Sequence, residues 1–95
     1  MFFIYLYYIM NKYISEFLGS LLFMYVILAS GNPLAIAAVF LLVIMVIAPI
    51  TGGDINPAVT IAKVQAGKLQ QSELLPYIAS QIAGTLAALQ IYNRI

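Results

Sequence analysis

The sequence has 95 residues, of which 64% are hydrophobic and 7% are charged, and its mean hydropathy is +1.04. A soluble domain of this size could not bury so much apolar surface, so the composition indicates a membrane protein. Neither His nor Cys is present and the net charge is only +1 without a basic cluster, so we expect no enzyme activity, no cofactor, no bound metal and no nucleic-acid partner.

Residues 1–12 form an apolar segment that is too short to cross a bilayer, because a helix needs about 20 residues to span the hydrocarbon core. Tyrosine is typical of membrane interfaces, and four tyrosines lie in or beside this segment: Tyr5, Tyr7, Tyr8 and Tyr13. A signal peptide is the competing interpretation, but no basic residue precedes the segment and no small-residue cleavage site follows it. We therefore favour an interfacial segment.

Two transmembrane helices are predicted next, over residues 13–30 and 34–50. A tight turn separates them, and Pro33 suits the first position of the second helix. The second helix has no charge and no side-chain hydrogen-bonding group, and Pro49 marks its end. Because the connection is so short, the two helices must be antiparallel.

Glu16 places a carboxylate in the first helix, on the same face as Gly19, Ser20 and Phe23. A carboxylate that faces lipid is costly, so this face should point into the protein. Alternatively, Glu16 lies at headgroup depth and merely favours the start of the helix. The spacing leaves both interpretations open.

Residues 51–66 are predicted to enter the membrane and turn back. Two glycines allow a reversal, after which Asn56 can cap a helix that Pro57 begins. The ten residues from Pro57 to Ala66 give a helix of about 15 Å, half the hydrocarbon thickness. The polar stretch 68–73 must lie in water, so Asn56 is expected near the bilayer midplane. Residues 51–55 should then face a pore or site, because non-helical backbone tolerates that depth only there or inside protein.

A third transmembrane helix is predicted over residues 73–93. Small residues recur every four positions along it, a pattern that lets helices approach closely; they are Ala79, Ala83 and Ala87, and beside them Ser80, Gly84 and Ala88. Gln81 is the polar side chain on this helix that we expect to be buried. It could bond the re-entrant backbone or simply another helix.

The stretch from Gly52 to Thr60, with Asn56-Pro57-Ala58 at its centre, resembles the first signature motif of the aquaporin, or major intrinsic protein, family of water and small-solute channels. Three further stretches resemble the family's helix motifs: Ser15–Gly19 in the first helix, Leu34–Ile36 at the entry of the second, and Tyr77 with Ser80–Gly84 in the third. The resemblance covers one of the family's two inverted repeats. It implies an all-α membrane fold, a half-repeat with three transmembrane helices and one re-entrant half-helix.

This resemblance also implies a set of pore residues. Asn56 would donate its amide to water or to a solute hydroxyl, and the backbone carbonyls of Gly52, Gly53, Asp54 and Ile55 would accept. Ile36 stands at the second-helix filter position, where the family often has an aromatic residue or His. An aliphatic residue there implies a wider, more apolar constriction, which favours small uncharged solutes such as glycerol along with water.

Two departures from the family pattern concern charge. The filter Arg that usually follows the family's second motif is absent, and Asp54 stands where His is common. A carboxylate near the mouth would attract cations unless it is paired, and Lys63 is the candidate partner. The alternative for Lys63 is a side chain that snorkels to the membrane surface.

One repeat alone leaves the re-entrant loop without the partner that closes the pore. We therefore expect a lipid bilayer environment and a second aquaporin-like half, either a separate chain or an inverted copy, in a homo- or hetero-oligomer. In the family's orientation Lys12, Lys63 and Lys68 are cytoplasmic and Arg94 is outside, which predicts a cytoplasmic N-terminus and favours a separate chain. The alternatives are a non-conducting truncated subunit that modulates full-length channels, and a gene remnant.

Overall fold

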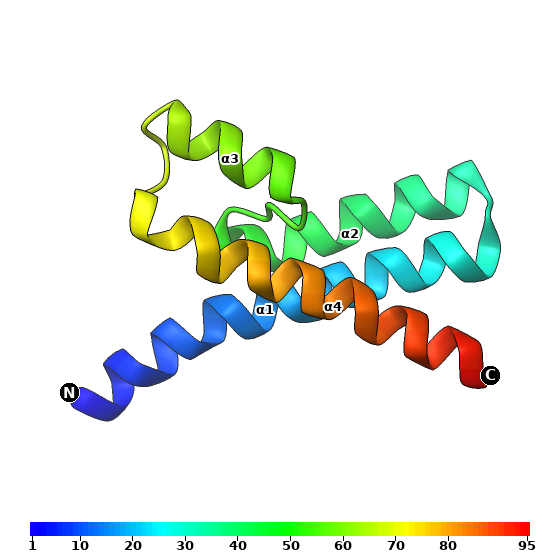
Figure 1. The fold of residues 1–95 in the computed structure, drawn as a ribbon, viewed down its shortest axis with the longest axis horizontal. Helices are drawn as coiled ribbons and strands as arrows, with labels where there is room; N and C mark the ends of the chain where they lie inside the picture. The colour runs from blue at the N-terminus through cyan, green and yellow to red at the C-terminus, as the bar shows by residue number, and fades with distance from the viewer.

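Over the 95 residues whose backbone the structure describes, three long helices and one short helix follow each other in the chain (Figure 1). The computed structural model also describes the side chains of residues 1–5 and 11–95. The elements are α1 (Phe2–Ser30), α2 (Pro33–Thr51), α3 (Pro57–Gln65), a 3-10 turn η1 (Gln71–Glu73) and α4 (Leu74–Arg94). The predicted all-α half-repeat is confirmed.

Three stretches are long and apolar enough to cross a membrane: Asn11–Ser30, Pro33–Thr51 and Gln71–Arg94. Large apolar side chains are exposed along them, among them Leu18 (54% exposed), Met45 (67%) and Leu86 (56%). A soluble protein would not expose such a surface, whereas lipid tails accept it without cost. The chain is therefore an integral membrane protein.

The turn between α1 and α2 takes up only Gly31 and Asn32. Gly31 ends α1 in the left-handed conformation, with φ at 57°. The Asn32 side chain then caps α2, since its Oδ1 accepts from the backbone N–H groups of Leu34 at 2.9 Å and Ala35 at 3.2 Å. This turn sends α2 back alongside α1, as Figure 1 shows.

Two helix boundaries differ from the predicted ones. The first helix begins at Phe2, so residues 2–12 continue the spanning helix as one element. The interfacial position of this segment stays a prediction, and the side chains of Tyr7 and Tyr8 lie outside the described ones. The second helix does not end at Pro49 but runs to Thr51, because a proline in the last turn removes only one N–H bond. Gly52 ends it, in the left-handed conformation and with its N–H bonded to the Ala48 carbonyl at 2.8 Å.

Helix α4 crosses α1 at very close range (Figure 1). The contact is made at Gly84, where a Cβ atom would lie 2.3 Å from the Phe17 carbonyl oxygen. Ala88, one turn further along α4, is fully buried. Ala79 and Ala83, from the other predicted row of small residues, are exposed. Close helix packing therefore uses one of the two rows, and it brings the polar groups of α1 and α4 within reach of each other.

Polar side chains tie the start of α4 to α1 at one end of the bundle. Lys12 Nζ lies 2.7 Å from a Glu73 carboxylate oxygen, and the Tyr13 hydroxyl donates to the other oxygen at 3.0 Å. The Tyr13 ring also packs edge-on against Tyr77, with centroids 6.1 Å apart. This cluster holds the polar stretch before α4 against the helix that precedes it by 60 residues.

Replacing Gly84 by Val should separate α1 from α4. The added side chain would collide with backbone rather than with a movable side chain, so we expect the free energy of unfolding to fall by about 2 kcal/mol or more. Thermal unfolding in detergent micelles, followed by circular dichroism, measures this. Ala83→Val is the matched control on the exposed face of α4, and equal losses in the two variants would contradict the prediction.

Candidate pore half-site

Asn56 connects the loop 52–55 to the short helix α3. Its side-chain Oδ1 caps α3 by accepting from the Ala58 N–H at 2.8 Å, and Pro57 occupies the first helical position. The nine residues of α3 measure about 14 Å, half of a membrane span. Capping fixes the amide orientation, and none of the hydrogen bonds among the described residues uses Nδ2. The Asn56 side chain is exposed and leaves this donor for an outside partner.

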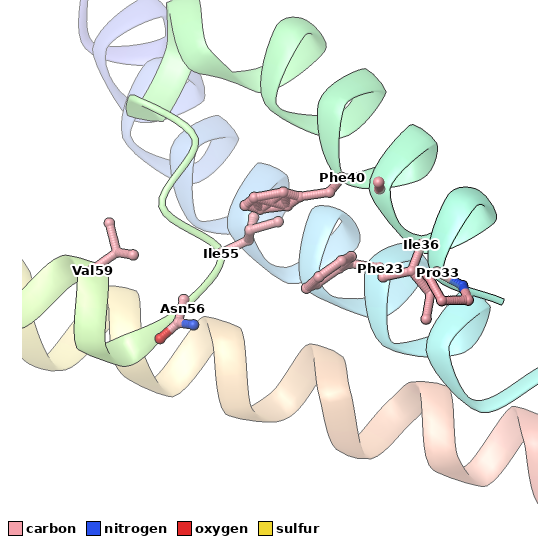
Figure 2. Close-up of a pocket in the computed structure, with 8 residues that line it drawn as sticks. Phe23, Pro33, Ile36, Phe40, Ile55, Asn56 and Val59 are labelled. Atoms are coloured by element: carbon pink, nitrogen blue, oxygen red, sulfur yellow. The ribbon is translucent and has the colours of Figure 1, made fainter. Parts of the chain in front are cut away.

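A groove of about 490 Å³ lies beside Asn56 (Figure 2). Two predicted pore residues that are twenty positions apart in the chain, Ile36 and Asn56, both line it. The full lining is Phe23, Pro33, Ile36, Ala37, Phe40, Ile55, Asn56 and Val59. The groove is therefore apolar, with the Asn56 amide as its polar side chain.

Phe40 lines this groove although the sequence analysis assigned it no role. It stands four residues after Ile36, one helical turn along the same face of α2, and this spacing could have identified it. Its ring packs on that of Phe23 from α1, with centroids 4.9 Å apart. Gly52, Gly53 and Asp54 are not in the lining, so the predicted role of their backbone oxygens stays a prediction.

The loop before Asn56 has an unusual backbone. Gly52 and Gly53 have φ values of 89° and 71°, and Ile55 has a φ of 43°. Glycine adopts such angles freely, but for a β-branched residue they cost of the order of 1–3 kcal/mol. Contacts elsewhere must therefore hold Ile55 in place.

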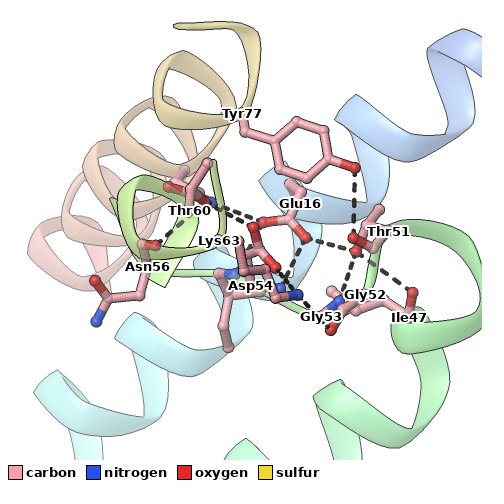
Figure 3. A network of polar contacts seen from close by, with 12 residues as sticks. Glu16, Ile47, Thr51, Gly52, Gly53, Asp54, Asn56, Thr60, Lys63 and Tyr77 are labelled. Carbon is pink, nitrogen blue, oxygen red and sulfur yellow. Dashed lines mark hydrogen bonds and ion pairs between the residues drawn. The ribbon is translucent and has the colours of Figure 1, made fainter. Parts of the chain in front are cut away.

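Glu16 supplies these contacts from α1 (Figure 3). Its carboxylate is fully buried, and one oxygen accepts from the Ile55 N–H at 2.8 Å and from Gln81 Nε2 at 2.9 Å. The other oxygen accepts from the Thr51 hydroxyl at 2.6 Å and from the Asp54 N–H at 3.3 Å. Such charge-assisted bonds are stronger than neutral ones and offset the desolvation of the carboxylate. Glu16 thus faces into the protein and binds the loop.

Gln81 joins three helices. Its Nε2 donates to Glu16 on α1 and, at 2.9 Å, to the hydroxyl of Thr60 on α3. Gln81 was expected to bond either the loop backbone or another helix. Its hydrogen bonds go to side chains on two other helices, and it is connected to the loop backbone only through Glu16. It ties α3 to the α1–α4 crossing.

Asp54 is paired with Lys63. Its carboxylate is buried, with one oxygen 2.5 Å from Lys63 Nζ and the other accepting from the Thr60 hydroxyl at 2.8 Å. Lys63 therefore reaches back to the loop rather than toward the membrane surface. Within the described side chains, no three acidic residues gather where they could hold a metal ion.

Two threonines complete the network, and the sequence analysis gave neither a role. Thr60 is fully buried, and its hydroxyl accepts from Gln81 while donating to Asp54. The Thr51 hydroxyl donates to Glu16 and accepts from the Gly53 N–H at 2.9 Å. A polar residue four positions after Asn56 on a short apolar helix was the available signal for Thr60.

The family model of the major intrinsic proteins matches residues 6–95. The chain belongs to the major intrinsic protein family. Members of this family are channels.

Three curated relatives are similar to this chain. One is "Glycerol uptake facilitator protein-like 6" of Lactiplantibacillus plantarum, 38% identical over 83% of this chain and 41% of its own length. The others are "Aquaporin Z" of Photorhabdus laumondii, 43% identical over 65% of this chain and 27% of its own length, and "Aquaporin Z" of Brucella melitensis, 33% identical over 86% and 42%. The chain thus spans less than half the length of these relatives. No solved structure matches it significantly.

Replacing Glu16 by Gln should destabilise the loop. A glutamine has one accepting oxygen, so its NH2 group would face donors that a carboxylate satisfies, at about 1–3 kcal/mol for each one left unpaired. The expected result is a lower midpoint of thermal unfolding. Glu73→Gln is the control, because the Glu73 carboxylate contacts two side chains, Lys12 and Tyr13, and accepts from no backbone N–H group among the described residues, and a loss as large as that of Glu16→Gln would contradict the prediction.

Proposed function

We propose that this chain forms one half of a channel for water and small uncharged solutes, and that a second aquaporin-like half completes the pore. The observation that carries the proposal is the exposed Asn56 amide, which is fixed by its cap and lines one groove with Ile36. Family membership supports the channel class. The groove is open on one side, as half of a pore would be.

Asn56 and the loop would supply the polar path for the permeating molecule. The Asn56 Nδ2 donates to water or to a solute hydroxyl. The backbone carbonyls of Gly53, Asp54 and Ile55 would accept, and no hydrogen bond among the described residues ends on these oxygens. The Gly52 carbonyl, which was also predicted to accept, already accepts from Lys63. The positive end of the α3 dipole lies at the same place and opposes protons and cations.

The apolar wall of the groove selects the solute. Ile36, Phe23 and Phe40 offer no hydrogen bond, so they favour small molecules with carbon atoms, such as glycerol, besides water. The printed name of the relative from Lactiplantibacillus plantarum, a glycerol uptake facilitator-like protein, supports this solute class.

The second half would come from a separate chain or from an inverted copy of this one, within a homo- or hetero-oligomer in the bilayer. The apolar, one-sided groove supports this need, because a polar loop at mid-membrane depth must be enclosed by protein or water. A cytoplasmic N-terminus, with Asn56 near the midplane, remains part of this proposal, and three of the four basic residues support it: Lys12, Lys63 and Lys68.

A tandem chain tests the proposal. Three spans are an odd number, so joining two copies end to end forces the second copy to insert in the opposite orientation. We expect proteoliposomes with this tandem protein to shrink several-fold faster than empty liposomes in stopped-flow light scattering under an osmotic gradient. The matched control carries Asn56→Asp in both copies and should return to the rate of empty liposomes.

Permeability of the single chain distinguishes the two sources of the second half. Conduction by the single chain above its own Asn56→Asp variant supports an inverted copy. Conduction by the tandem alone shows that the two halves must be held together. A tandem protein that folds but conducts no better than the control contradicts the pore and favours a non-conducting modulator.

Replacing Ile36 by Phe should narrow the constriction, so that only smaller solutes pass. The phenylalanine ring is larger than the isoleucine side chain, and it should hinder glycerol more than water because glycerol is the wider molecule. We expect the ratio of glycerol to water permeability of the tandem to fall several-fold. Ala38→Phe, on the exposed side of α2, is the control, and an unchanged ratio in Ile36→Phe would show that this position is not part of the constriction.

A further inference from the structure

The ammonium group of Lys63 contacts the loop 52–55 at two residues, Gly52 and Asp54. Lys63 Nζ lies 2.5 Å from Asp54 Oδ1 and 3.4 Å from the carbonyl oxygen of Gly52 (Figure 3). Side chains on a helix lean toward its N-terminus, so a lysine in the last turn of α3 can reach back to the loop that α3 follows. Lys63 thereby links α3 to the end of α2 across eleven residues.

The loop leaves room for this lysine. A Cβ atom on Gly52 would lie 2.8 Å from Lys63 Nζ, too close for a carbon atom. Gly52 also has a φ of 89°, which other residues rarely adopt. A glycine at position 52 therefore allows both the backbone conformation of the turn and the close approach of Lys63.

Glu16 and Lys63 bind complementary groups of the loop, because Glu16 accepts hydrogen bonds from it and Lys63 donates hydrogen bonds to it. Glu16 accepts from the backbone N–H groups of Asp54 and Ile55, whereas Lys63 donates to the Gly52 carbonyl and the Asp54 carboxylate. Since the Ile55 φ of 43° is unfavourable, the loop needs such contacts to keep its shape. The loop ends at Asn56, so its shape sets the direction of the Asn56 amide.

We propose that the Lys63–Asp54 ion pair is a positioning device that fixes the conformation of the loop 52–55 and thereby aims Asn56 into the groove. The fixing of the loop stands on the contacts alone. Only its consequence for permeation rests on the proposed channel function.

The two partners are unequal, which gives the proposal a distinctive signature. Asp54 is 1% exposed, whereas the Lys63 side chain is 31% exposed. Removing Lys63 leaves a buried carboxylate without its cation, a costly state. Removing the charge of Asp54 leaves a lysine that can turn to water, while the Thr60 hydroxyl keeps an oxygen acceptor on the new amide. Neutralising Asp54 should therefore repair the loss of Lys63.

Amide hydrogen exchange of the full chain in lipid nanodiscs tests the positioning role. In Lys63→Met we expect about tenfold faster exchange at Gly53, Asp54 and Ile55, with no change at the α1–α4 contact around Gly84. Asp54→Asn should have a smaller effect. The double variant Asp54→Asn/Lys63→Met should exchange more slowly at these amides than Lys63→Met, and Lys63→Arg should resemble the unmodified chain.

Lys68→Met is the matched control, since Lys68 is exposed and makes no ion pair among the described side chains. Equal exchange in Lys63→Met and Lys68→Met would overturn the proposal, and so would a double variant no better than Lys63→Met. If Lys63→Met does not fold, the comparison of Lys63→Arg with Lys63→Gln decides, because only the first keeps the charge. Equal exchange in those two would then overturn it.

The water permeability of the tandem protein is a second test of the proposal. We expect Lys63→Met in both copies to reduce water permeability several-fold, and Asp54→Asn/Lys63→Met to recover part of it. A loosened loop with unchanged permeability would overturn the link between the pair and Asn56. A tandem that conducts in no form would reject the channel function, while the exchange measurements would still decide the role of the pair.

Discussion

A backbone loop between two helices leaves N–H groups without helical partners, and in this chain the Glu16 carboxylate accepts from two of them. The Ile55 and Asp54 N–H groups donate to it, together with the Thr51 hydroxyl and the Gln81 amide. The charge is stable there only because these donors replace water. The unusual backbone at Ile55 and the placement of Asn56 both depend on this buried carboxylate.

Close packing of α1 and α4 makes this arrangement possible. Gly84 lets the α4 backbone approach the Phe17 carbonyl, and the approach brings Gln81 within hydrogen-bond distance of Glu16. Gln81 also donates to the Thr60 hydroxyl, which links α3 to the crossing of α1 and α4. A short helix that buries few apolar side chains is thus held by polar contacts, which are strong in the low dielectric of a protein interior.

The chemistry of the site divides the loop into two faces. Behind it, Glu16 accepts from the backbone N–H groups of the loop, and Lys63 pairs with Asp54. In front of it, the Asn56 amide meets an apolar groove. This separation keeps both carboxylates away from the groove that the proposed permeation path would use.

Local chemistry in the sequence was enough to predict three spans and one short helix, because hydrophobic length, turn residues and the half-length of residues 57–66 indicate them, and the resemblance to the family added the half-repeat. It also contained the cap at Asn56 and the candidate partner of Asp54. Two boundaries needed the structure: residues 2–12 continue α1, and Gly52 rather than Pro49 ends α2. The inward position of Glu16 and its meeting with Gln81 and Thr60 became clear only from the folded chain. Those contacts join residues 21 to 65 positions apart, and no local pattern selects one partner over another at such distances.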